Sequence, residues 1–344
     1  MKFFDTHAHV NFNAFKDDGE AVLLRCLQAG LSVVNVGSQY STSKRAVDYA
    51  HKFENFPKAK PSEEGLAFGG DNPISPISPL NPLDSKSLNL LNQKPLEPLS
   101  PFNPLNPIGI YAAVGIHPVH LKKGSFTHVD PEELTEEEIP TTGEIFDYGK
   151  YLELARDEKV VAIGEVGLDY HHFEPIDDIE FLKNLQKETL LKFIDLANEV
   201  QKPIMIHCWG VKSSKELDHT RTDAYDDLLE ILEKHPVAKR GIIHSFIGSY
   251  KTANSFIALG YKLGLNGIIT YGNGYDRLIR EIDLKNIVLE TDCPYLTPRP
   301  LERGSRNEPL FVEQVAQKIA DVKNISLEQV ANQTWKNACE ILGL

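Results

Sequence analysis

The chain has 344 residues, 41% of them hydrophobic and 25% charged, which are ordinary values for a soluble globular protein. Its formal net charge of −13 argues against a protein that coats nucleic acid, because such proteins usually carry a basic face. An enzyme that neutralises a polyanion locally is not excluded. No signal-peptide pattern and no run near the roughly 20 apolar residues of a membrane helix is found. We therefore expect a cytoplasmic protein without a membrane partner.

Short β-branched runs alternate along the chain with segments of helical spacing. Nearly continuous apolar strands separated by amphipathic helices are typical of a parallel sheet covered by helices. Eight such units predict a (β/α)8 barrel of the TIM type, which usually takes about 250 residues. A doubly wound open sheet is the alternative. The expected strands are 3–8, 32–37, 110–116, 160–166, 203–207, 241–245, 262–266 and 287–291. The expected helices are 18–30, 41–54, 178–200, 224–235, 250–259, 308–321 and 326–342.

The remaining length is interpreted as insertions into a single barrel domain that spans residues 1–344. Residues 57–108 contain proline at short intervals in repeated Asn/Ser-Pro-Leu/Ile units, which break helices and strand pairing. We expect a disordered surface loop between the second and third barrel units, rather than leucines packed over the barrel. Smaller insertions are expected at 121–146, which is acidic, and at 210–223. The four cysteines lie far apart and predict neither a disulfide framework nor a zinc knuckle.

The first expected strand contains two histidines that are candidate metal ligands. His7 and His9 are two residues apart, so on a strand their side chains point to the same face. Paired imidazoles suit zinc or another transition metal. Glu165, His207 and His244 each follow an apolar run that is predicted to be a strand. Because the carboxyl ends of barrel strands converge on one mouth, we expect all five side chains to meet there.

Asp292 follows the last predicted strand and completes this candidate site. A buried carboxylate is costly without a partner, so a metal or a proton-handling role accounts for it best. Glu290, two residues earlier, is interpreted as a salt-bridge partner.

These residues belong to motifs that resemble the TatD family of metal-dependent deoxyribonucleases, within the amidohydrolase superfamily. The similarity covers essentially the whole chain outside the insertions. The matching segments are DTHAHV (5–10), AAVGIHP (112–118), AIGEVGLDY (162–170), IMIHC (204–208), IIHSFIGS (242–249), LETDCPYLTP (289–298), RGSRNEP (303–309) and NQTWKNACEILGL (332–344).

The resemblance implies a barrel that cleaves DNA with two divalent metal ions, commonly as a 3′-to-5′ exonuclease on single-stranded DNA or frayed DNA ends. The metal identity (Zn, Mg or Mn) stays open, and no obligate protein partner is evident. The positions that match the family's two-metal site imply His7 and His9 for the more buried ion, His207 and His244 for the other, Glu165 as the bridge, and Asp292 as both ligand and general base.

The same resemblance implies substrate contacts around the metal ions. His117, in GIHP, resembles a family position near the scissile phosphate. Arg303 and Arg306 follow the last strand and are expected to steer the polyanion by bidentate contacts. The alternative for both arginines is an ordinary loop salt bridge with Glu302 or Glu308.

Departures from the family pattern leave the substrate open. Cys208-Trp209-Gly210 replaces the Arg-bearing run that often follows His207, and His171 and His172 follow GLDY. Trp209 can stack on a base or serve as a core or lid residue. A hydrolase of another ester (aminoacyl-tRNA, a lactone or a small phosphoester) is therefore the alternative, because fold and ligands do not fix the substrate. A non-catalytic protein that docks partners through 57–108 is a third reading, against which the intact ligand set argues.

Overall fold

A computed structural model of the protein describes residues 1–54, 108–130, 135–174, 177–210 and 224–344. Eight parallel strands form one sheet in the order β1-β2-β3-β6-β7-β8-β9-β10. The sheet curls into a nearly closed TIM-like barrel, so the predicted fold class is confirmed and the open doubly wound sheet is wrong. The strands are β1 (Phe3–Ala8), β2 (Leu31–Val36), β3 (Ile110–Val114), β6 (Val160–Asp169), β7 (Ile204–Trp209), β8 (Gly241–Ile243), β9 (Lys262–Leu265) and β10 (Ile287–Leu289).

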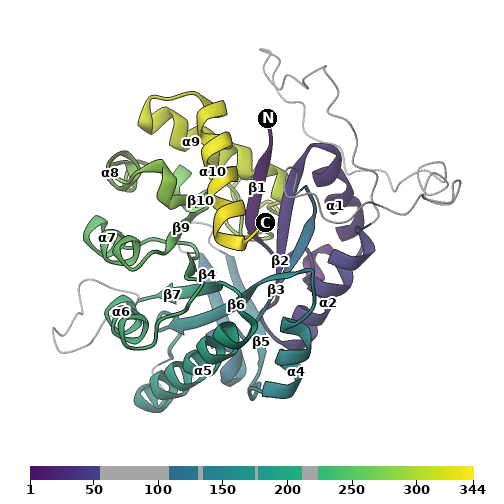
Figure 1. The fold of residues 1–344 in the computed structure, drawn as a ribbon, viewed down its shortest axis with the longest axis vertical. Helices are drawn as coiled ribbons and strands as arrows, with labels where there is room; N and C mark the ends of the chain where they lie inside the picture. Colours follow the sequence, from purple (N-terminus) through teal and green to yellow (C-terminus); the bar gives the residue numbers. More distant parts are fainter. Residues whose placement is uncertain (55–107, 131–134, 175–176, 211–223) are drawn as a thin grey trace, which may run out of the picture. The chain divides into compact units, whose positions relative to one another are not determined.

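The helices surround the strands as a ring, and α10 crosses one end of the barrel (Figure 1). Side-chain caps set several helix starts: Ser326 accepts a hydrogen bond from the Gln329 backbone at the start of α10. Within the described residues, no helix combines the length and apolar composition needed to cross a bilayer. The helices are α1 (Gly19–Gln28), α2 (Tyr40–Lys52), α4 (Tyr148–Ala155), α5 (Ile179–Val200), α6 (Ala224–Lys234), α7 (Tyr250–Ala258), α8 (Asp276–Glu281), α9 (Val312–Lys323) and α10 (Leu327–Leu342).

Side chains and loop backbone join β1 to β10, the two edge strands of the sheet. The Thr6 hydroxyl donates to the Leu289 carbonyl over 3.0 Å, and the Asp292 amide donates to the His7 carbonyl over 2.8 Å. The buried Asp5 carboxylate accepts from the Thr291 amide over 2.9 Å. These bonds fix the loop after β10 against β1, and with it two of the predicted ligands.

A β-bulge in β1 lets one strand serve both the apolar core and the mouth. Phe4 packs in the core and His7 faces the mouth, although strict alternation would place residues three apart on opposite faces. Between Asp5 and Ala8 the pairing with β2 slips by one residue, which restores the shared face. A second slip, between Ile163 and Val166 of β6, lies at Glu165.

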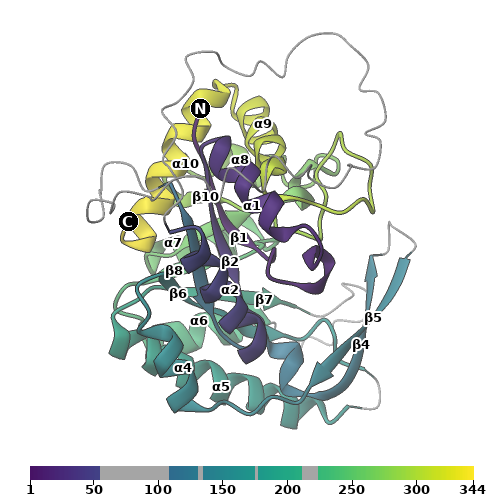
Figure 2. The ribbon, with the colours of Figure 1, turned by 90° about the vertical axis from the view of Figure 1, so that its right-hand side faces the viewer.

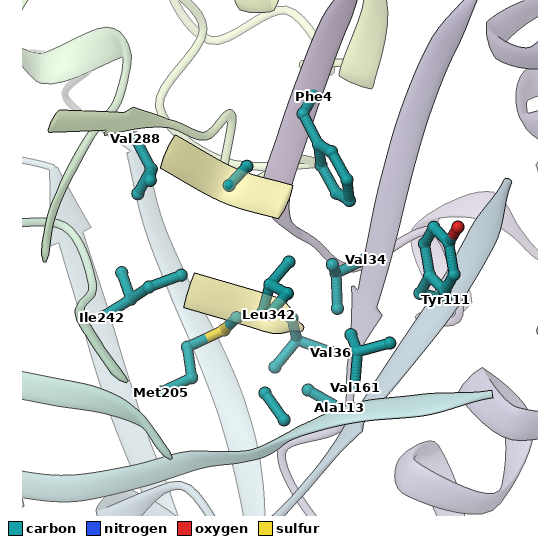
Figure 3. Close-up of a cluster of buried hydrophobic side chains, with 12 residues drawn as sticks. Phe4, Val34, Val36, Tyr111, Ala113, Val161, Met205, Ile242, Val288 and Leu342 are labelled. Carbon is teal, nitrogen blue, oxygen red and sulfur yellow. The ribbon is translucent and has the colours of Figure 1, made fainter. Parts of the chain in front are cut away.

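Apolar side chains from the barrel strands and α10 form the core at the end of the barrel opposite the ligands. Ala338 and Leu342 of α10 pack among Val36, Met205 and Ile242 of the strands (Figure 3). The C-terminal helix therefore closes this end of the barrel.

Several elements were not predicted. Residues 121–146, expected as an acidic insertion, contain the antiparallel hairpin of β4 (Lys123–Asp130) and β5 (Thr135–Thr142), which stands out from the barrel on the side opposite α10 (Figure 2). The short helices α4 and α8 have too few turns to produce a periodic signal. The predictions for 57–107 and 211–223 lie outside the described residues.

We predict that Leu342→Ala lowers the free energy of unfolding by about 2–4 kcal/mol, because Leu342 is 5% exposed and its truncation leaves a cavity under the barrel. Urea unfolding monitored by circular dichroism measures the change. Lys336→Ala, at an exposed position of the same helix, is the control. Equal stabilities of the two variants would contradict the role assigned to α10.

Candidate metal centre

All six predicted ligands lie close together at the carboxyl ends of five strands. His7 belongs to β1 and His9 follows it, whereas Glu165 and His207 lie within β6 and β7. The other two predicted ligands, His244 and Asp292, follow β8 and β10. Overlapping groups of three among these residues place their ligand atoms within 4.8 Å of one another. Strand β6 ends at Asp169, four residues beyond Glu165, whereas the sequence predicts a strand over 160–166.

Glu165 lies at the centre of the cluster and presents its two oxygens to different histidines. Its Oε2 lies 3.4 Å from His7 Nε2 and 3.7 Å from His9 Nε2. Its Oε1 lies 3.1 Å from His207 Nδ1 and 3.6 Å from His244 Nε2. This is the arrangement expected of a carboxylate between two cations.

Asp292 faces the same cluster from the loop after β10. Its Oδ1 lies 3.2 Å from His9 Nε2, and its Oδ2 lies 3.6 Å from His244 Nε2. Its side chain is 15% exposed, more than any of the other five. Asp292 has a φ of 56°, a region that non-glycine residues rarely occupy and that is common at functional sites.

The donor atoms fit a cation better than they fit one another. His9 donates its Nδ1 hydrogen to the Val36 carbonyl over 2.9 Å, so the neutral ring has a lone pair on Nε2. That lone pair faces Asp292 Oδ1 at 3.2 Å and His7 Nε2 at 3.2 Å. Nitrogen and carboxylate ligands aimed at a common point suit divalent transition metals and zinc.

Both carboxylates are ionised at neutral pH. Burial alone would raise the pKa of Glu165, but the charge of His244 and the hydrogen bond from His207 outweigh it and hold this pKa well below its ordinary value. Asp292 has a lowered pKa for the same reason, since His244 and His9 offset its burial. Both groups are therefore available as anionic ligands.

The histidine pKa values follow their partners. Burial alone would lower the pKa of His207, but hydrogen bonds with Asp169 and Glu165 raise it to about 9. The pKa of His244 is also raised, because Glu290 and Asp292 outweigh its burial. The raised pKa values of His207 and His244 reflect the negative charge of the carboxylates around them.

Glu290 is paired with a ligand histidine, as a salt-bridge partner should be. Its Oε1 lies 3.1 Å from His244 Nδ1 and accepts a hydrogen bond from the Ser245 amide. The side chain is fully buried. Glu290 therefore lies inside the site and not on the protein surface.

His117 also reaches the cluster. Its Nε2 lies 3.5 Å from Glu165 Oε1, and its ring meets that of His207 at 4.2 Å. The Val119 amide donates to His117 Nδ1 over 3.3 Å, so the neutral ring has its hydrogen on Nε2. Burial and the neighbouring His207 hold the pKa of His117 well below its ordinary value, so this neutral form predominates.

A cleft of about 120 Å³ opens onto the ligands and has largely apolar walls. Phe12 stacks on His9 with ring centroids 4.2 Å apart, and Trp209 lies along His172 at 5.7 Å. Sequence reasoning considered Trp209 and missed the other wall residues, which lie in loops without a periodic signal. The apolar and aromatic wall residues are Phe12, Val119, Trp209, Tyr295 and Leu296.

The structure does not bring Arg303 and Arg306 to this cleft. Arg306 forms ion pairs with Asp18 at 2.6 Å and Glu308 at 2.9 Å, as in the alternative considered for it. The guanidinium of Arg303 lies over the Tyr271 ring, 4.6 Å from its centroid. Neither arginine is among the cleft-lining residues of the described chain, and their contact with a substrate stays a prediction.

Comparison with known proteins places this site in a family. The model of TatD-related DNases matches residues 104–343. The uncharacterized metal-dependent hydrolase YabD of Bacillus subtilis (strain 168) is 38% identical over 232 residues, which cover 67% of this chain and 76% of that protein. The chain belongs to the TatD-related DNase family. It is accordingly a metal-dependent hydrolase.

Other relatives extend the likeness over the full TatD fold. The uncharacterized metal-dependent hydrolase YjjV of Escherichia coli (strain K12) is 26% identical over 340 residues, covering 98% of this chain and 96% of that protein. The crystal structure of YjjV, a TatD homologue, matches 99% of this chain and 98% of that chain with a TM-score of 0.66. A TatD-family hydrolase from Entamoeba histolytica matches 99% of this chain and 98% of that chain at 18% identity, with a TM-score of 0.67. The structural matches establish the barrel fold.

We predict an acid-sensitive contribution of His120, a buried residue beside the cleft. Burial lowers its pKa to about 4, compared with about 6.5 in an unfolded chain. The contribution of neutral His120 to the free energy of unfolding is complete above pH 6.5. It is lost as the pH falls toward 4, and the loss reaches about 3 kcal/mol. Between pH 7.5 and 4.5, in EDTA, the protein should lose about 2–3 kcal/mol more unfolding free energy than His120→Gln. Equal losses in urea titrations would refute this assignment.

Proposed function

We propose that this protein is a deoxyribonuclease that hydrolyses phosphodiester bonds of DNA, as a 3′-to-5′ exonuclease on single-stranded or frayed ends. The observation that supports this most is the split environment of Glu165: Oε2 faces His7 and His9, and Oε1 faces His207 and His244 with His117 beside them. Such an arrangement suits two cations, and paired cations suit phosphodiester hydrolysis. The name of the matching family model supports the choice of DNA.

In this proposal the ligands divide between two divalent ions, Zn, Mg or Mn. His7 and His9 would hold the more buried ion, since their side chains are 0% and 4% exposed. His207 and His244 would hold the other, and Glu165 would serve as a ligand to both. Asp292 contributes a ligand oxygen from the cleft side. When bound, the ions lower the pKa of a water molecule and neutralise charge on the phosphate.

The protein's own groups handle the proton and the position of the substrate. Asp292 is ionised and the most exposed of the six, so its carboxylate can accept the proton of the attacking water. Glu165 is buried and held between the histidines, so it stays an anionic ligand throughout. Positioning and charge neutralisation then supply most of the catalysis.

His117 stabilises the scissile phosphate in this proposal. Its ring is neutral and its Nε2 hydrogen points into the cluster, 3.5 Å from Glu165 Oε1. A phosphate oxygen held at this place can accept that hydrogen as charge builds up in the transition state.

A hydrolase of another ester, such as aminoacyl-tRNA, a lactone or a small phosphoester, is the second candidate. The cleft favours it in one respect: among the described residues, its lining includes no lysine or arginine. Walls formed by Phe12, Trp209 and Tyr295 suit a compact substrate with an apolar or planar group. The nuclease remains the first choice because of the family match.

We predict that Glu165→Gln abolishes metal-dependent removal of nucleotides from the 3′ end of labelled single-stranded DNA. The loss should be at least about 100-fold, because removing a ligand must exceed the 10–100-fold cost typical of its outer partners. The assay uses Mg²⁺, Mn²⁺ and Zn²⁺ in turn. Glu158→Gln, a matched change on the surface, should retain full activity. A wild-type protein without metal-dependent cleavage, or an equally active Glu165→Gln, rules out the nuclease.

We predict that His117→Ala lowers kcat by about 100-fold and leaves the number of bound metal ions unchanged, since its hydrogen acts on the substrate and not on the ions. Single-turnover cleavage and metal analysis of the purified variant measure both quantities. Loss of an ion from the variant would instead make His117 a ligand.

A further inference from the structure

Asp169, at the end of β6, connects a metal-centre histidine to the wall of the cleft. The residue is 1% exposed. Its Oδ2 lies 3.0 Å from His207 Nε2 and 2.8 Å from His172 Nδ1. Its Oδ1 accepts a hydrogen bond from the His172 backbone amide over 3.0 Å. Both oxygens are therefore occupied by donors in fixed directions.

The backbone around Asp169 is also fixed. The Gln186 side chain of α5 accepts from the Asp169 amide over 2.9 Å and donates to the Asp169 carbonyl over 3.0 Å. Gln186 is itself 4% exposed. The carboxylate therefore has little freedom to turn away from His207.

The two proposed ligand histidines that face Glu165 Oε1, His207 and His244, use different ring nitrogens. His207 directs Nδ1 toward Glu165 and Nε2 toward Asp169. His244 does the reverse, with Nε2 toward Glu165 and Nδ1 toward Glu290. A neutral imidazole can ligate only through the nitrogen without hydrogen, so the hydrogen bond between His207 Nε2 and Asp169 selects the tautomer of the His207 ring.

We propose that Asp169 is a positioning residue of the metal centre: it accepts the Nε2 hydrogen of His207 and so presents Nδ1 of that ring to the ion. His172 and Gln186 hold Asp169 in place. The proposal rests on His207 as a ligand, which belongs to the proposed function, but it does not depend on DNA as the substrate.

Asp169→Asn tests this directly because of the fixed donors. In this variant, only the oxygen of the side-chain amide introduced at position 169 can accept the hydrogen bond from the His172 backbone N–H. The side-chain NH₂ therefore lies where Oδ2 lies in the wild type. There it donates to His207 Nε2 and forces the ring hydrogen onto Nδ1, the ligand atom. The size and shape of the side chain are unchanged.

The experiment titrates the metal-free full-length protein with Zn²⁺ in a calorimeter and measures bound zinc. The wild type should bind two ions. Asp169→Asn should retain one ion at wild-type affinity and bind the other about 10–100-fold more weakly. Asp227→Asn is the matched control, since Asp227 is a buried aspartate that accepts from Tyr170, outside the ligand set, and it should bind both ions normally. Wild-type binding by Asp169→Asn, or equal weakening of both ions, overturns the proposal.

Two variants of His172 test the support of Asp169 without touching its carboxylate. His172→Phe removes the Nδ1 donor but keeps a ring beside Trp209, and the same ion should bind a few-fold more weakly. His172→Asn, whose amide can donate to Asp169, should restore affinity. In ¹⁵N-histidine spectra of the zinc-loaded wild type, His207 should show a protonated Nε2. An unprotonated Nε2 contradicts the proposal. If the wild type binds zinc as expected but does not cleave DNA, only the proposed nuclease activity is rejected, and the role of Asp169 stands.

Discussion

The buried carboxylate of Glu165 among five imidazoles is the interaction on which the site depends. A charge that is 3% exposed is costly unless nearby groups compensate it. Here the imidazoles hold its pKa well below the ordinary value, and the carboxylates of Asp169 and Glu290 balance the outer nitrogens of His207 and His244. Carboxylates and imidazoles therefore alternate outward from Glu165, through His207 to Asp169 and through His244 to Glu290. Divalent ions suit it because they replace protons at several of these atoms at once.

The backbone reconciles this polar mouth with an apolar core on the same strands. β1 must place Phe4 in the core and His7 at the mouth, three residues apart, and the bulge between Asp5 and Ala8 makes both possible. The slip in β6 lies at Glu165 itself. Bulges are common beside active sites because they redirect a side chain while the strand stays paired on both sides. The bond from the Asp292 amide to the His7 carbonyl then fixes the last ligand against the first.

Local patterns were sufficient to predict the barrel and the close approach of the six candidate ligands. Each ligand follows or ends an apolar run, and a parallel barrel brings all strand ends to one mouth. The pattern could not show that β6 continues to Asp169, because GEVGLD contains two glycines and two carboxylates and does not resemble an apolar strand. The contacts of Asp169 with His207 and His172 were therefore not predicted, nor were the loop residues Phe12 and Tyr295 on the cleft wall. These contacts depend on tertiary geometry, which no spacing along the chain encodes.

The distribution of arginines bears on how a polyanion could bind. Arg306 forms ion pairs with Asp18 and Glu308, and the described lining of the cleft contains no lysine or arginine. In the proposed nuclease, attraction for a phosphate would come mainly from the metal ions, since the net charge of −13 repels anions at long range. Substrate affinity and catalysis would thereby depend on the same ions, and a residue that weakens the binding of one ion would affect both. In the proposed site, the tautomer of His207 is for this reason a property of the active site and not only of the fold.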